Sequence, residues 1–398
     1  MQKIKQIYAD NAATTPMSNT VINAIKPYIN ELYANPSSLY SDARKVRNAI
    51  ENAREIVAKY IGAKPSEIYF TSGGTESNNW AIKSLYLEYY FGTEGNMNHI
   101  ITSQIEHPSV LRTCGYLESI GANVTYLPVD NMGFVNPKDL EKALTNRTTL
   151  VSIMSANNEI GTIQPLKKVG NICKSAKVYF HTDAVQVFGK HDINVEELNV
   201  DMLTISGHKI HAPKGVGALY VKDRVEIDPF IHGGAQENGY RTGTENVTGI
   251  IGLGQAVLDL QTKSLAQKKT LVFLRDNLCN KLLTIPNSHI NGSFMYRLHN
   301  NISITFKGIR ADALVLALDL NGIQISAGSA CSAHGDKPSH VLKAIGLSDE
   351  EAASTVRITL GDDVTMNDTN IIADEIGKAV IMLRKIGFVK DLDDEFLV

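Results

Sequence analysis

The 398-residue sequence has few cysteines, no long hydrophobic run and no excess of charge of either sign. Its four cysteines are too few and too scattered for a disulfide framework, and no CxxC pair suggests a zinc site, so we expect a reducing compartment and no metal. The longest apolar stretch, residues 313–320, is interrupted by Asp319 and is far shorter than the roughly 18 residues of a membrane span. The cysteines are Cys114, Cys173, Cys279 and Cys331.

The charge balance is also nearly even, with 39 basic and 42 acidic residues and a net charge of -3. This composition gives no global electrostatic reason to bind nucleic acid directly or to bind an anionic membrane. Residues 1–16 lack the apolar stretch of a signal peptide. We therefore expect a soluble cytoplasmic protein whose partners are recognised locally.

Short apolar runs alternate with longer amphipathic segments, a pattern typical of βαβ units and a mainly parallel sheet sandwiched by helices, and hence of an α/β fold. Polar or glycine-rich residues follow five of the six runs, and ligands of such sheets bind outside the carboxyl ends of the strands, so we expect these tips to meet at one cleft. The six expected strands are residues 67–71, 99–103, 124–128, 150–155, 178–183 and 202–206.

After about residue 250 the pattern changes to a long helical stretch that should stop before Pro286, because the residue preceding a proline is disfavoured in a helix. Alternating apolar residues at 302–306 and a helical pattern at 312–321 follow. We predict a large domain of residues 15–255 and a smaller α+β domain of residues 1–14 and 256–398, which carries Cys331.

Residues 72–78, Ser-Gly-Gly-Thr-Glu-Ser-Asn, follow an expected strand and precede a helical pattern. Glycines let the backbone approach an anion, and the N-terminus of a helix favours a phosphate. Taken alone, the motif is more often a glycine turn, here capped by Thr75, than a phosphate site. It is not a Walker motif, because no Gly-Lys-Ser/Thr follows, and it lacks GxGxxG spacing.

Three charged or polar residues lie at the ends of two further strands. Asp183 ends a strand apolar enough to be central, where a carboxylate needs a cationic partner such as a protonated ring nitrogen, and Gln186 could reach another edge of the same ring. Lys209 lies in a compact turn where partial burial would lower its pKa and free its amine for Schiff-base chemistry. The alternatives are a helix cap for Asp183 and a solvated surface charge for Lys209.

Together, a phosphate cradle, an aspartate and a lysine are the three groups by which proteins hold pyridoxal 5'-phosphate (PLP). At this point the sequence resembles the cysteine desulfurases, class V of the fold-type-I PLP-dependent transferases. The resemblance extends from Tyr-Ala-Asp-Asn-Ala-Ala-Thr-Thr-Pro at residues 8–16 to Val-Arg-Ile-Thr-Leu-Gly at residues 356–361.

The resemblance implies a role for individual residues. Lys209 would carry the cofactor as a Schiff base, Asp183 would pair with the pyridine nitrogen and Gln186 would bond the phenolic oxygen, while His107 would stack on the ring and move protons. Asn157 and Arg357 match the substrate-carboxylate contacts, and a guanidinium fork suits a carboxylate. The phosphate would be held by Gly74, Thr75, Ser206, His208 and, from the neighbouring subunit of a homodimer, Thr244.

Cys331 separates the chemistries that share this scaffold. It lies in a stretch of Gly, Ser and Ala that resembles the longer-loop desulfurase group, where a mobile thiol takes sulfur from the substrate. A lone cysteine is more often a buried small hydrophobe, as we expect for Cys114, Cys173 and Cys279. The sequence departs from the family pattern at Ala34, Tyr40, Ala43 and Asp362.

The resemblance implies a sulfurtransferase that converts L-cysteine to L-alanine and leaves a persulfide on Cys331. That sulfur would pass to an acceptor protein, an iron-sulfur scaffold or a tRNA-thiolation enzyme. The alternatives are another class V PLP enzyme, either a selenocysteine lyase or an aminotransferase, and a sulfur-relay scaffold without turnover. An aminotransferase would need no mobile cysteine, and intact Lys209, Asp183, His107 and Cys331 argue against a scaffold that lost its activity.

Overall fold

The computed structural model describes residues 6–93, 95–262, 265–328 and 338–395. Its largest sheet has seven strands in the order β2-β8-β7-β6-β5-β3-β4. The strands are β2 (Ile68–Thr71), β3 (His99–Ser103), β4 (Asn123–Leu127), β5 (Thr148–Ser152), β6 (Tyr179–Asp183), β7 (Met202–Ser206) and β8 (Gly217–Val221). All six expected strands are present, with boundaries that agree within a few residues.

Strand β8 is the element that the sequence pattern missed. It pairs antiparallel with both β2 and β7, whereas the other described pairs of this sheet are parallel. The pattern missed β8 because residues 212–217, which are mostly small, have the composition of a turn, and β8 begins at the end of this turn. Gly217 begins β8, where a Cβ atom would lie 2.7 Å from Cα of Gly73, so close contact with the neighbouring turn requires glycine.

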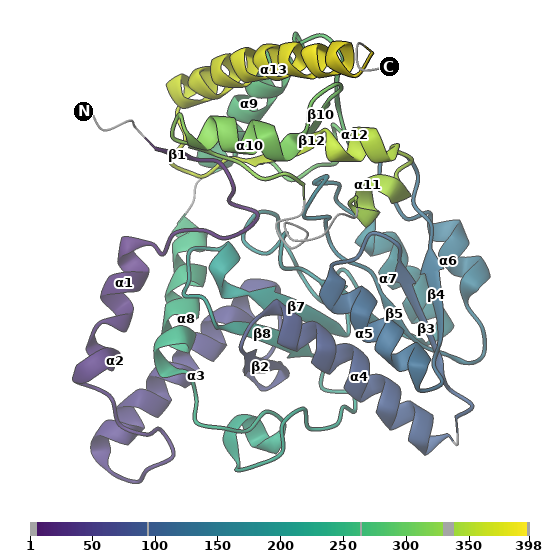
Figure 1. Ribbon diagram of the computed structural model, residues 1–398. Helices are drawn as coiled ribbons and strands as arrows, with labels where there is room; N and C mark the ends of the chain where they lie inside the picture. Colours follow the sequence, from purple (N-terminus) through teal and green to yellow (C-terminus); the bar gives the residue numbers. More distant parts are fainter. Residues whose placement is uncertain (1–5, 94, 263–264, 329–337, 396–398) are drawn as a thin grey trace.

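Helices cover both faces of this sheet (Figure 1). Helices α4 (Gly74–Gly92) and α5 (Pro108–Ser119) pack on one face in a cluster that includes Trp80, Ile100 and Met202. The opposite cluster includes Phe180 and Leu203 and is covered by α3 (Ser41–Ile61), α6 (Pro137–Ala143), α7 (Leu166–Ala176) and α8 (Val247–Thr262). The expected mainly parallel sheet between two helical layers is therefore confirmed.

A three-stranded antiparallel sheet lies at the top of Figure 1, in the order β12-β10-β9. Its hydrophobic cluster also contains Ile7 and Ala9 from the start of the chain. The elements of this region are β9 (Ser288–Ile290), β10 (Asn301–Phe306), β12 (Thr355–Thr359), α9 (Leu265–Leu282), α10 (Ala311–Asp319) and α13 (Met366–Glu395). Helix α9 ends before Pro286, as predicted.

Two features bear on the predicted division into domains. Strand β1 (Ile7–Tyr8) pairs in parallel with β11 (Ile323–Gln324), and helix α8 crosses the boundary predicted between residues 255 and 256. The division into two domains stays a prediction. The remaining elements are α1 (Asn19–Ile25), α2 (Pro27–Asn30), α11 (His340–Ala344), α12 (Asp349–Ala353) and the 3-10 turns η1 (Pro65–Glu67), η2 (Gly207–Lys209) and η3 (Gln236–Gly239).

The described helices include none that is both long and apolar enough to cross a bilayer. Cys114, Cys173 and Cys279 are buried free thiols, which confirms their expected place in the core. Burial raises the pKa of each thiol, to about 12 for Cys114 and Cys173 and to about 11 for Cys279. At neutral pH these three groups are therefore protonated and poorly nucleophilic.

Candidate active site

A cavity of about 290 Å³ lies at the carboxyl edge of the seven-stranded sheet. Its wall contains residues that follow β2, β3, β5, β6 and β7, so the expected meeting of the strand tips is confirmed. Among the predicted site residues, those that line it are Gly74, Thr75, His107, Asp183, Gln186, Ser206, His208, Lys209 and Arg357.

The turn between β2 and α4 forms one end of the cavity. Gly73 caps α4 with φ of 148°, and Gly74 begins the helix. A Cβ atom on Gly74 would lie 2.8 Å from Cγ2 of Val185, so a side chain here would require Val185 to shift. The first N–H groups of an α-helix have no partner within the helix, and the helix dipole favours negative charge there. This end of the cavity is suited to bind an anion.

Asp183 is held at the end of β6 by two donors. Its Oδ2 accepts a hydrogen bond of 2.7 Å from Nδ2 of Asn78, and its Oδ1 accepts one of 3.0 Å from the backbone N of Val185. Asn78 also donates to Oγ of Ser109, at 2.8 Å. The amide of Asn78 therefore connects the Asp183 carboxylate with the start of α5.

The connection continues from Ser109 to His107. Nδ1 of His107 accepts from the backbone N of Ser109 at 3.1 Å and lies 2.8 Å from its hydroxyl. Because Nδ1 is an acceptor, the proton of the neutral ring is on Nε2. Burial lowers the pKa of His107, despite the opposing charge of Asp183, which favours this neutral form. His107 can therefore present an N–H group to the cavity.

Lys209 lies in η2, directly after β7. Its Nζ donates to the carbonyl oxygens of Ala12 and Ala13, at 2.6 and 2.7 Å. The side chain of Gln186 donates to the same carbonyl of Ala12, at 3.1 Å. The N-terminal segment therefore forms the wall of the cavity beside the lysine amine.

His208 lies beside this segment as well. Its Nδ1 is 3.1 Å from Oγ1 of Thr14. Burial lowers the pKa of His208 to about 4, and the nearby charges of Lys209 and Lys214 act in the same direction. The ring is therefore neutral at physiological pH and is suited to hydrogen bonding rather than to ion pairing.

Arg357 extends into the site from β12 and is almost fully buried. Nη2 donates to Oδ1 of Asp10 at 2.7 Å, and Nη1 donates to the carbonyl of Asn158 at 3.0 Å. Nε is buried and has no hydrogen-bond partner among the described residues. The guanidinium is thus fixed in place while part of its donor capacity remains for a ligand.

Asn157 does not line this cavity in the described part of the chain, whereas Asn158 does. The side chain of Asn157 accepts from the backbone N of Glu159 and Ile160 and donates to the carbonyl of Ile105. It therefore stabilises the loop after β5. The substrate contact expected for Asn157 stays a prediction.

Thr244 is also not among the described residues of the cavity wall, and its side chain is exposed. Cys331 lies outside the described residues. Before residues 329–337, which are not described, Ser326 forms backbone hydrogen bonds with Arg357. After them, Oγ of Ser339 donates to Oε2 of Glu159 at 2.6 Å. Ser326 and Ser339 thus both contact residues at the cavity wall.

Sequence reasoning missed three buried polar residues of the site: Asn78, Ser109 and Glu106. Oε1 of Glu106 accepts from Oγ of Ser103 at 2.6 Å and from the backbone N of Met154 at 2.9 Å. Its Oε2 is buried without a partner among the described residues, and burial raises the pKa of Glu106 to about 8. Two features of the sequence could have indicated these residues. Asn78 lies one helical turn after Gly74, and Glu106 directly precedes His107.

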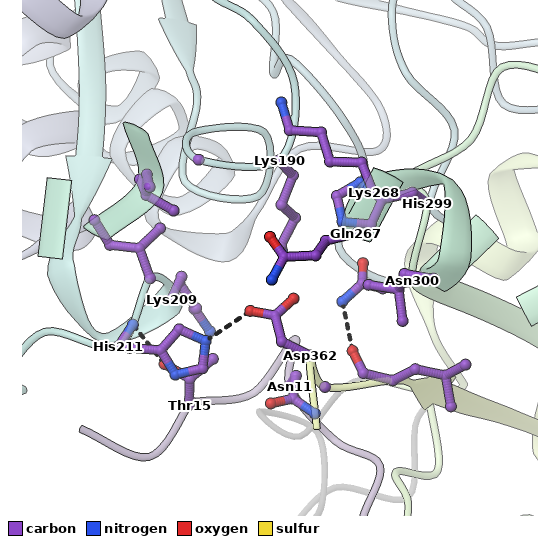
Figure 2. A pocket seen from close by; sticks show the side chains of 16 residues that line it. Asn11, Thr15, Lys190, Lys209, His211, Gln267, Lys268, His299, Asn300 and Asp362 are labelled. Atoms are coloured by element: carbon purple, nitrogen blue, oxygen red, sulfur yellow. Dashed lines mark hydrogen bonds and ion pairs between the residues drawn. The ribbon is translucent and has the colours of Figure 1, made fainter. Parts of the chain in front are cut away.

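A second, smaller cavity of about 50 Å³ lies against Lys209 and Thr15 (Figure 2). Nε2 of His211 is 3.6 Å from Oδ2 of Asp362 at its edge. Asp362, one of the departures from the family pattern, therefore contacts the segment that follows Lys209. Nζ of Lys190, another lining residue, donates to Oε1 of Gln186 at 3.2 Å and so links the two cavities.

Residues 7–372 match the family model described as aminotransferase class-V. The chain is 48% identical to "Cysteine desulfurase IscS" of Methanosarcina thermophila over 96% of this chain and 94% of that protein. It is similar to a solved "NifS-like protein", with a TM-score of 0.89 and 38% identity over 95% of this chain and all of that one. A second solved structure, "SspA in complex with cysteine", has a TM-score of 0.79 and 43% identity over 89% of this chain and 99% of that one.

The chain therefore belongs to the aminotransferase class-V family and, within it, to the cysteine desulfurases. The resemblance drawn from the sequence, the fold class and the enzyme class are confirmed.

Proposed function

We propose that this protein is a PLP-dependent cysteine desulfurase that acts as a homodimer. It takes sulfur from L-cysteine, releases L-alanine and holds the sulfur as a persulfide on Cys331. The observation that carries the proposal is the convergence of Lys209, Asp183 and the N-terminus of α4 on one cavity of about 290 Å³. Relatives named for this activity and a similar structure in complex with cysteine support the choice of substrate.

The residues of the cavity fit the cofactor. The volume suits a ligand of this size, and the cavity has an anion-binding helix terminus at one end and a buried carboxylate behind it. Gly74, Thr75, Ser206 and His208 would hold the phosphate, Asp183 the ring nitrogen, Gln186 the phenolic oxygen and Lys209 the aldehyde. PLP, when bound, supplies an electron sink for the negative charge that develops on the substrate.

The residues of this chain would then orient the substrate and move its protons. Arg357 would bind the carboxylate, because a fixed guanidinium presents parallel donors. Nζ of Lys209 would take the α-proton and return it. His107, neutral with its proton on Nε2, would donate a hydrogen bond from Nε2 and would move a proton only after first accepting one.

The sulfur step would use Cys331. Its thiolate attacks the sulfur of the substrate, the carbon–sulfur bond breaks, and the bonding electron pair stays with the carbon, which takes up a proton to give alanine. The transferred sulfur becomes the outer atom of a persulfide. The contacts of Ser326 with Arg357 and of Ser339 with Glu159 support this role, because they bring both sides of the Cys331 segment to the cavity wall.

The persulfide would pass to an acceptor protein for iron-sulfur cluster assembly or tRNA thiolation, in the cytoplasm. A homodimer would explain Thr244. Thr244 is exposed in the single chain. It lies three residues after Arg241, which is bound to Glu76 in the first turn of α4. In a homodimer, Thr244 of one subunit could therefore contact the phosphate bound in the cavity of the other subunit.

The test is to supply L-cysteine to the purified holoenzyme with and without a thiol reductant, and to measure alanine and sulfide. We expect catalytic release of both products with reductant, and about one alanine per subunit with one additional sulfur on Cys331 without it. Cys331→Ser should abolish both. Cys173→Ala, which removes a buried thiol of raised pKa, is the matched control and should keep both. Wild-type sulfide release by Cys331→Ser would contradict the proposal.

A further inference from the structure

A bidentate ion pair joins two distant segments next to the phosphate end of the cavity. Nε of Arg241 donates to Oε1 of Glu76 at 2.8 Å, and Nη2 of Arg241 donates to Oε2 at 3.2 Å. The Glu76 side chain is 11% exposed and that of Arg241 is 21% exposed. Two parallel charge-assisted hydrogen bonds in a largely buried setting fix the relative position of both segments.

Glu76 also holds the turn that would bind the phosphate. Its Oε2 accepts a hydrogen bond of 3.1 Å from the backbone N of Ser72, four residues earlier. Two glycines, Gly73 and Gly74, follow Ser72, and such a turn is flexible unless contacts from outside restrain it. Glu76 is therefore a restraint on the direction in which the N–H groups of this turn point.

The position of Glu76 raises an electrostatic question. It lies in the first turn of α4, so a bare carboxylate there would oppose the binding of a phosphate at the same helix terminus. Burial alone would raise the pKa of Glu76, but the hydrogen bonds from Arg241 and Ser72 outweigh it and the pKa is lowered. The group is thus a carboxylate, and Arg241 neutralises its charge.

We propose that Arg241 and Glu76 are positioning residues for the phosphate of the cofactor. Glu76 restrains the turn at residues 72–75, and Arg241 fixes Glu76 and cancels its charge, so that a doubly negative group can bind beside it. This inference rests on the proposed binding of PLP at this turn.

The test compares the affinity of full-length protein, freed of cofactor, for PLP and for pyridoxal, which lacks the phosphate. Arg241→Ala should weaken PLP binding about tenfold or more, since it leaves a charged carboxylate beside the phosphate, and should change pyridoxal binding less than about twofold. Arg241→Lys should weaken PLP binding less than Arg241→Ala does and should leave pyridoxal binding unchanged. Adding Glu76→Gln to Arg241→Ala should recover part of the PLP affinity, because it removes the unneutralised charge.

The matched control is Arg224→Ala. Nη2 of Arg224 pairs with Oδ1 of Asp201 at 2.7 Å. Asp201 directly precedes β7, so this ion pair lies at the end of the strand away from the cavity. It should leave both affinities unchanged. Equal losses of PLP and pyridoxal affinity in Arg241→Ala and Arg241→Lys, or no loss of either, would overturn the inference. A wild-type protein that binds PLP no better than pyridoxal would instead contradict phosphate binding and the proposed function.

Discussion

Arg357 donates a hydrogen bond of 2.7 Å from Nη2 to Oδ1 of Asp10, across almost the whole length of the sequence. The cation predicted to bind the substrate carboxylate is therefore already in contact with a carboxylate of the protein. Asp10 thus orients the guanidinium and reduces its net charge. Nε is buried, so the N–H groups of Nη1 and Nη2 that Asn158 and Asp10 do not engage are the donors left for a substrate.

Arg357→Ala should injure substrate binding more than cofactor binding. Loss of a charged hydrogen bond costs about 1.5–3 kcal/mol, so kcat/KM for cysteine should fall on the order of ten- to a hundredfold, with KM raised. Arg357→Lys should recover only part of this, because a point charge cannot reproduce two parallel bonds. Steady-state kinetics at saturating PLP would check this, and variants with the parent's kcat and KM would show that Arg357 is structural.

Lys209→Ala should abolish covalent attachment of PLP, because an amine of the protein is needed to bind the aldehyde. The measurement is borohydride reduction of the holoenzyme followed by peptide mass spectrometry, together with the visible absorption of the purified protein. Lys214→Ala, at an exposed position in the same loop, is the control and should keep the attachment. Cofactor found on another lysine in the wild type would refute the assignment of Lys209.

Thr244 should act across the subunit boundary, which mixed dimers can test. We expect Lys209→Ala and Thr244→Ala homodimers each to lose activity at subsaturating PLP. When the two are unfolded and refolded together, the mixed dimer should regain one intact site, made of Lys209 from one subunit and Thr244 from the other. Activity should then exceed that of either parent, whereas no gain on mixing would mean that Thr244 serves its own subunit or no site.

Glu106 should make the stability of the protein depend on pH. Its pKa is about 8 in the folded protein against an ordinary value of 4.5, so between these values the folded state holds a proton that the unfolded chain releases. The free energy of unfolding should therefore fall as pH rises through this window, by at most about 1.4 kcal/mol per pH unit.

Glu106→Gln carries no such proton. Its melting temperature relative to the wild type should rise between pH 5 and pH 8 by a few degrees, on the order expected from this free-energy range. Glu55→Gln, at an exposed position on α3, should show a constant difference instead. Scanning calorimetry at several pH values would measure both, and parallel curves for Glu106→Gln and the wild type would rule out the raised pKa.

The sequence predicted most of the sheet, because buried parallel strands such as β3 and β7 are continuous apolar runs that end at polar residues. The sequence also predicted that Asp183 and Lys209 share one cleft, because Asp183 ends such a run and Lys209 lies in the turn that follows another. Strand β8 was missed because its start, at Gly217, is dictated by contact with Gly73, and that contact joins residues 144 positions apart.

The missed polar residues have the same physical cause. Asn78 belongs to the site because its amide reaches Asp183 and Ser109, which lie 105 and 31 positions away. Local spacing carries no information about such partners. The difference between Asn157 and Asn158 is equally invisible in the sequence, because it depends on which side chain of a loop faces the cavity.

The N-terminal segment has a consequence for the synthesis of the protein. Ala12 and Ala13 accept hydrogen bonds from Lys209, but the strand just before them pairs with Ile323 and Gln324, roughly 300 residues later. At 5–20 residues per second, the ribosome needs roughly 15–60 s to supply that partner. Lys209 is made about 115 residues before that partner, so for roughly the last 6–23 s of this interval the nascent chain has its lysine but lacks the strand that anchors the segment over it. Cofactor loading during translation would therefore meet a more open site than loading of the finished protein.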